Sequence, residues 1–67
     1  MILKQAVGKR IQGLRREKQL SQEELAEQAG IHRTYMGAVE RGEKNATIET
    51  LEKIAMALGV KVGELFE

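Results

Sequence analysis

The sequence predicts an all-α fold, a compact bundle of five short helices that forms a single domain over residues 1–67. Apolar residues recur at spacings of three and four along most of the chain, which is the period of a helix face. Glycines follow three of these patterns, and the chain has no proline. No segment shows the strict alternation of a half-buried strand. A domain of this size buries only about 60% of its unfolded surface, so efficient helix packing or oligomerisation must support it.

The first helix is expected from about Ile2 to Lys18. Its apolar face is formed by residues at spacings of four, four and three: Leu3, Val7, Ile11 and Leu14. Gly8 and Gly13 interrupt this helix, and each weakens it by roughly 1 kcal/mol relative to Ala. We therefore expect both glycines to lie where a neighbouring backbone comes close.

The second helix has the clearest start in the chain. Ser21 occupies the N-cap position and Glu24 follows three residues later, which is a capping box. Leu20 before the cap and Leu25 after it have the spacing of a hydrophobic staple. Gly30 is expected to end the helix, because glycine readily adopts the left-handed conformation of a C-terminal cap.

Three further helices complete the fold. The third is expected from about Arg33 to Arg41, and Gly42 ends it. The fourth begins near Thr47 and ends before Gly59. Its residues on one face are apolar: Ile48, Leu51, Ile54, Ala55 and Leu58. The last is a short turn of helix at about Val62–Phe66.

The second and third helices form a helix-turn-helix at about residues 22–41, because two short helices are joined through a glycine turn. Met36 and Val39 point inward on the third helix. Its opposite side carries polar or small residues: Arg33, Thr34, Gly37, Ala38 and Arg41. Arginine can donate two hydrogen bonds to guanine, and threonine can contact a base edge or a thymine methyl group. This face predicts binding of duplex DNA, with the third helix in the major groove.

Charge is unevenly distributed although the whole chain carries only +1. Six basic residues and one Glu give residues 1–22 a net charge of +5, and residues 23–29 hold three Glu and no base. From charge alone, a solvated helix surface is the favoured interpretation of the basic segment. The alternative is one wall of a DNA-binding face. The acidic segment is expected to be a solvated face, favourable near a helix N-terminus.

Several function classes are disfavoured by composition. The chain has no Cys, no Asp and a single His, so we expect no disulfide and no zinc or calcium site. It lacks a Cys, Asp or Ser–His arrangement for catalysis and is too small to enclose a substrate pocket. We therefore do not expect an enzyme, and we expect no cofactor and no small-molecule ligand. Its apolar runs are too short for a membrane span or a secretion signal, which favours a cytoplasmic protein.

The segment LSQEELAEQAGIHRTYMGAVERGEKN resembles the lambda-repressor-like, Cro-type (XRE) helix-turn-helix family. The resemblance extends back to VGKRIQGLRREKQ and forward to TIETLEKIAMALGVKVGELF, so it covers nearly the whole chain. The part RTYMGAVERGEKN is especially similar to the controller proteins of restriction–modification systems. That resemblance implies a small sequence-specific transcriptional regulator that acts on DNA as a homodimer.

The resemblance also implies residue roles. It implies that Arg33 and Thr34 contact bases. Gly37 and Ala38 are implied to line the same groove, and Lys44 to reach a base. Contacts with the DNA backbone are implied for Gln22, Tyr35, Arg41 and Asn45, and also for Lys44 beside its reach to a base. For Tyr35, a ring at the edge of the core with its hydroxyl in water is an equal alternative. Arg15 and Glu40 are implied to form a structural ion pair, which is favoured over a catalytic role for Glu40 because an unpaired buried carboxylate is costly.

The chain departs from the family pattern at three positions. His32 stands at a helix cap where Ser or Thr is usual, so weaker capping is expected there, and neither a pH switch nor a metal ligand is favoured. Ala38 is small where many relatives have a long polar side chain, which predicts fewer base contacts and more dependence on DNA shape. Lys61 stands where Ser often caps the last helix.

A dimer is expected because one recognition helix reads only a few base pairs, whereas a dimer reads two half-sites about one helical turn apart. The binding site on DNA is then pseudo-palindromic. The expected dimer interface consists of apolar C-terminal residues: Val60, Val62, Leu65 and Phe66. The alternative is an antitoxin-type helix-turn-helix protein whose main role is to bind a partner protein.

Overall fold

The computed structural model describes residues 3–67, which form four α-helices and one 3-10 helix. The elements are α1 (Leu3–Glu17), α2 (Gln22–Ala29), α3 (Arg33–Glu40), α4 (Ile48–Leu58) and η1 (Val62–Phe66). No strand occurs between residues 3 and 67, so the predicted all-α class is confirmed. The fifth element is a 3-10 helix rather than an α-helix, and the predicted start at Ile2 lies outside the described residues.

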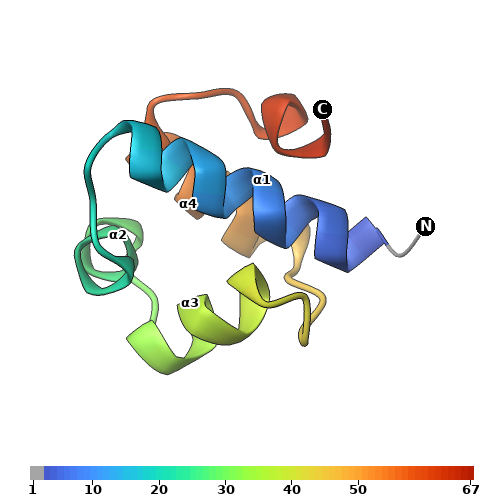
Figure 1. The fold of residues 1–67 in the computed structure, drawn as a ribbon, viewed down its shortest axis with the longest axis horizontal. Helices are drawn as coiled ribbons and strands as arrows, with labels where there is room; N and C mark the ends of the chain where they lie inside the picture. The colour runs from blue at the N-terminus through green and yellow to red at the C-terminus, as the bar shows by residue number, and fades with distance from the viewer. Residues whose placement is uncertain (1–2) are drawn as a thin grey trace.

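The helices surround one hydrophobic core. In Figure 1, α1 crosses in front of α4, η1 covers one side of this pair and α3 lies on the other side. The α2 helix contacts both α3 and α4. Every element contributes at least one fully buried side chain to the core: Ile11, Leu25, Met36, Val39, Ile54, Leu58 and Leu65. Among the described residues, no helix has the length and apolar character that a membrane span requires.

The predicted capping box at the start of α2 is present. The hydroxyl of Ser21 accepts a hydrogen bond from the Glu24 backbone N–H at 3.0 Å, and the Glu24 carboxylate accepts one from the Ser21 backbone N–H at 2.8 Å. These bonds, first the one from the Ser21 backbone, hold the pKa of Glu24 below its ordinary value. Gly30 closes the helix with φ of 72°. The start of α2 and the turn to α3 are therefore fixed by local hydrogen bonds.

The two glycines of α1 have different surroundings. A Cβ added at Gly8 would lie 2.4 Å from the Val39 carbonyl oxygen and 2.6 Å from the Glu40 carbonyl oxygen. The close backbone approach predicted for Gly8 therefore exists, and it lets α1 and the end of α3 pack directly. The same expectation was wrong for Gly13, because a Cβ there would meet no atom within 4 Å.

We expect the same substitution to have opposite effects at these two positions of α1. Gly8→Ala should lower the free energy of unfolding by about 1–3 kcal/mol, because the added methyl group forces two backbones apart. Gly13→Ala should raise it by up to about 1 kcal/mol through helix propensity. Urea unfolding monitored by circular dichroism measures both changes. A gain in stability from both substitutions would contradict the close packing of α1 on α3.

Candidate nucleic-acid interface

The N-terminal end of α2 and the outer side of α3 enclose an open hollow on the protein surface, which we call the α2–α3 hollow. Its lining residues come from both helices of the helix-turn-helix and their ends: Ser21, Gln22, Glu23, Arg33, Thr34, Gly37 and Arg41. Five of these residues were predicted to contact DNA, namely Gln22, Arg33, Thr34, Gly37 and Arg41. The fold therefore gathers on one surface residues that are up to 19 positions apart in the sequence.

The start of α3 is held by an unusual cap. His32 is the N-cap residue, and its Nδ1 accepts a hydrogen bond from the Thr34 backbone N–H at 3.0 Å. An imidazole nitrogen accepts a hydrogen bond only when it carries no proton, so this cap uses the neutral ring. The cap fixes the backbone of the first turn, where Arg33 and Thr34 begin the outer face of α3.

The inner side of α3 is anchored by a buried ion pair. Arg15 of α1 donates two hydrogen bonds to the Glu40 carboxylate, from Nε at 2.8 Å and from Nη2 at 3.0 Å. Its Nη1 donates a third to the Leu20 carbonyl oxygen at 2.8 Å. The Gln22 side chain also donates to Glu40, at 3.1 Å. One cluster therefore connects α1, the approach to α2, the first residue of α2 and the last residue of α3.

Gly37 forms the floor of the α2–α3 hollow. A Cβ added there would lie 3.0 Å from Nη1 of Arg41 and 3.4 Å from Oε1 of Gln22. These two polar side chains therefore extend over the glycine, which is itself buried. Its missing side chain brings two hydrogen-bonding groups close to the axis of α3.

Ala38 is buried, like Gly37 before it. Only 8% of its surface is accessible, and the Glu43 backbone N–H donates to its carbonyl oxygen at 2.9 Å as the chain turns back after α3. This burial leaves the Ala38 side chain little surface for DNA, and its predicted place in the groove stays a prediction.

Both arginines of the hollow are paired with carboxylates. Arg33 donates to Glu23 of α2, and Arg41 donates to Glu43 in the loop after α3. The hydrogen bond from Arg41 lowers the pKa of Glu43, and the carboxylate in turn raises the pKa of Arg41. All four side chains are exposed, and exposed pairs contribute little to stability. The arginines can therefore exchange these partners for other anions.

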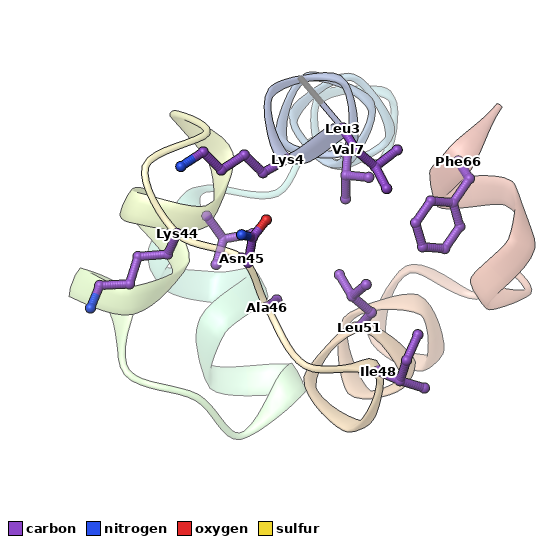
Figure 2. A pocket seen from close by; sticks show the side chains of 10 residues that line it. Leu3, Lys4, Val7, Lys44, Asn45, Ala46, Ile48, Leu51 and Phe66 are labelled. Carbon is purple, nitrogen blue, oxygen red and sulfur yellow. The ribbon is translucent and has the colours of Figure 1, made fainter. Parts of the chain in front are cut away.

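The remaining predicted DNA contacts lie outside the α2–α3 hollow. Tyr35 is half-buried and packs against the hydrophobic core. Lys44 and Asn45 lie in the loop between α3 and α4, where they border a second and largely apolar hollow. In Figure 2 the Lys44 side chain points away from the centre of that hollow. Its ammonium group is thus presented at the same end of α3 as Arg41.

The second hollow, which we call the α1–α4 hollow, was not predicted. It lies between the first turns of α1 and α4, the loop before α4 and the aromatic ring of Phe66 (Figure 2). Its lining residues are Leu3, Lys4, Val7, Val39, Lys44, Asn45, Ala46, Ile48, Leu51 and Phe66. Leu3, Ile48 and Phe66 are 57%, 61% and 45% exposed, which is unusual for large apolar side chains in this small domain.

One residue of the expected dimer interface needs a correction. Leu65 is completely buried in the core of its own chain, so it has no surface to offer a partner. Val60 and Val62 are half-buried at the opposite end of α4, beside Met56. Only Phe66 of the four predicted residues borders the α1–α4 hollow. Leu3 and Ile48 were assigned to core faces by their spacing, but both stand at the first position of a helix and remain exposed.

Glu23 and Glu43 were also missed as parts of the site. The sequence places Glu23 in an acidic segment that is expected to be solvated, ten residues away from Arg33. Nothing in that spacing pairs the two residues, because only the turn between α2 and α3 brings them together. Glu43 lies two residues beyond Arg41, and a bidentate contact at that spacing depends on the path of the loop.

Comparison with known proteins identifies a family. The family model described as Helix-turn-helix, HTH_3, matches residues 11–65. The control protein C.SmaI of Serratia marcescens is 45% identical over 65 residues, which cover 97% of this chain and 77% of the relative.

Two solved structures extend the comparison. The restriction–modification controller protein C.AhdI from Aeromonas hydrophila has a TM-score of 0.92 and 43% identity, covering 94% of this chain and 96% of its own. SinR, described as a master regulator for biofilm formation and solved in complex with DNA, has a TM-score of 0.87 and 40% identity. The match covers 91% of this chain and 98% of that one.

Proposed function

This chain belongs to the helix-turn-helix family HTH_3, and on that premise we propose that it is a sequence-specific transcriptional regulator that binds duplex DNA. The observation that carries the proposal is the α2–α3 hollow, where two exchangeable arginines and the Gln22 amide surround the outer side of α3. The similar SinR structure in complex with DNA supports it. We propose that all 67 residues act as one lambda-repressor-like domain.

In the proposed complex, α3 lies in the major groove and its first turn meets the base edges. Arg33 donates two hydrogen bonds to a guanine, and Thr34 contacts a neighbouring base edge or thymine methyl group. The His32 cap supports this turn by fixing its backbone. Gly37 contributes through its small size, because it lets α3 and the side chains above it approach the groove closely.

Gln22 and the residues after α3 position the protein on the DNA backbone. One N–H of the Gln22 side-chain amide bonds to Glu40, which leaves the second N–H for a phosphate. The N-terminus of α2 favours the same anion. Arg41, Lys44 and Asn45 supply further phosphate contacts, and Tyr35 contributes its hydroxyl. These contacts carry no sequence information, but they fix the orientation in which α3 reads the bases.

We further propose that two copies bind a pseudo-palindromic site as a homodimer. The α1–α4 hollow is the proposed contact surface, because it is apolar, exposed and adjacent to the loop that carries Lys44 and Asn45. Contact near the C-terminal end of α3 would place the two recognition helices on the same side of the dimer. This proposal replaces the interface around Val60, Val62 and Leu65 and retains Phe66.

Two substitutions separate base reading from phosphate binding. Arg33→Ala should weaken binding by about 1–3 kcal/mol and relax the preference at one base pair of each half-site. Lys44→Ala should weaken binding to all duplexes and reduce the slope of log affinity against log salt by about one. Fluorescence anisotropy with duplexes selected by the wild-type chain measures both effects, with the exposed Lys53→Ala of α4 as the charge control. Unchanged affinity and sequence preference in Arg33→Ala would remove α3 as the reading helix.

The position of the dimer surface is tested by placing one charge at either end of α4. Ile48→Glu should weaken self-association, because it puts a carboxylate in the α1–α4 hollow, while an acidic residue in the first turn favours the helix. Met56→Glu, at an 82% exposed site at the other end, should leave association unchanged. Sedimentation at micromolar concentration distinguishes the variants. If Met56→Glu weakens association and Ile48→Glu does not, the interface lies at Val60 and Val62 instead. A wild-type chain that is strictly monomeric, with and without DNA, would exclude the dimer and favour a separate partner protein.

A further inference from the structure

Arg41 is held by a carboxylate at the edge of the α2–α3 hollow. Its Nε donates to one oxygen of Glu43 at 2.8 Å, and its Nη2 donates to the other at 3.3 Å. The third nitrogen, Nη1, lies over Gly37, where an added Cβ would be only 3.0 Å away. The guanidinium group thus has two nitrogens on Glu43, while the third faces the surface proposed to bind DNA.

The backbone fixes Glu43 in the position from which it holds Arg41. The Glu43 N–H donates to the Ala38 carbonyl oxygen at 2.9 Å, and the Gly42 N–H donates to that of Val39 at 3.1 Å. Gly42 has φ of 75°, and a Cβ there would lie within 2.9 Å of Gln5 in α1. The chain therefore leaves α3 along one path, which returns the Glu43 carboxylate to Arg41.

A carboxylate at this place has two electrostatic disadvantages. It follows the C-terminus of α3, where the helix dipole favours positive rather than negative charge. It also precedes Lys44 and Asn45, where the proposed function places DNA phosphates that would repel it. Among the contacts of the Glu43 side chain in the described residues, the ion pair with Arg41 is the one that favours a glutamate at this position. Its hydrogen bond also lowers the pKa of Glu43.

Building on the proposed function, we propose that Glu43 is an intramolecular competitor of DNA phosphate for Arg41. In the free chain the carboxylate occupies the guanidinium group and removes one positive charge from the edge of the hollow. A duplex engages the two nitrogens that Glu43 holds only by displacing the carboxylate, so the pair lowers the affinity that the arginine would otherwise provide. Glu43 thereby sets the strength of DNA binding without contacting DNA.

The test is a double-mutant cycle on DNA affinity. The wild-type chain, Glu43→Gln, Arg41→Gln and the double variant are compared by anisotropy, on a duplex selected by the wild-type chain and on a scrambled duplex of equal length. Glu52→Gln, an exposed site on α4, controls for the lost negative charge. Glu43→Gln should tighten binding about two- to fivefold more than Glu52→Gln does, the range expected for an exposed pair. This extra gain should disappear in the Arg41→Gln background.

A second measurement tests the pair without DNA. In an NMR titration of the Glu43 carboxyl, Arg41→Gln should raise its pKa, because the arginine holds that pKa below its ordinary value. An unchanged pKa, a gain equal to that of Glu52→Gln, or a gain that persists without Arg41 would each overturn the competitor role. If the wild-type chain binds neither duplex, the proposed function itself is wrong and the inference falls with it. If wild-type binding behaves as proposed, those results overturn only the role of Glu43.

Discussion

The buried ion pair between Arg15 and Glu40 is the interaction on which the arrangement of this protein depends. The Arg15 side chain is 11% exposed and that of Glu40 is fully buried, so either charge left alone would carry a large desolvation penalty. Four groups meet in this hydrogen-bonded cluster: the Arg15 guanidinium, the Glu40 carboxylate, the Leu20 carbonyl and the Gln22 amide. The pair connects α1 and α3 in one orientation, and the helical period then determines which residues of α3 face outward.

The outer surface gains its chemistry from that inner constraint. Glu40 draws Gln22 toward α3, and Gly37 leaves room for Gln22 and Arg41 to extend across the helix. Arg33 and Arg41 are held by exposed carboxylates that DNA phosphates can replace at little cost in free energy. Glu40, in contrast, is held by Arg15, and loss of that partner would leave a buried charge unpaired. A rigid inner side and an exchangeable outer side suit a surface that must keep its shape while it takes up DNA.

Local signals in the sequence predicted most of the fold. The capping box at Ser21 and the glycine turn at Gly30 are both confirmed, because caps and turns depend on residues within a few positions of one another. Helical period also predicted the inward side of α3. It did not predict the burial of Ala38 or of Leu65, since period gives the direction of a side chain but not what packs against it. The pair of Arg33 with Glu23 was not predictable for the same reason, because it arises only when two helices meet.

Selection of binding sites from a pool of random duplex DNA is the most direct test of the central claim, that the surface around α3 reads sequence in a two-fold complex. We expect a pseudo-palindromic consensus whose two half-sites are centred about one helical turn apart. We also expect a guanine in each half-site at the position that Arg33 reads. A pool that shows no enriched sequence, or a consensus without two-fold symmetry, would show that the surface around α3 does not read DNA in this way.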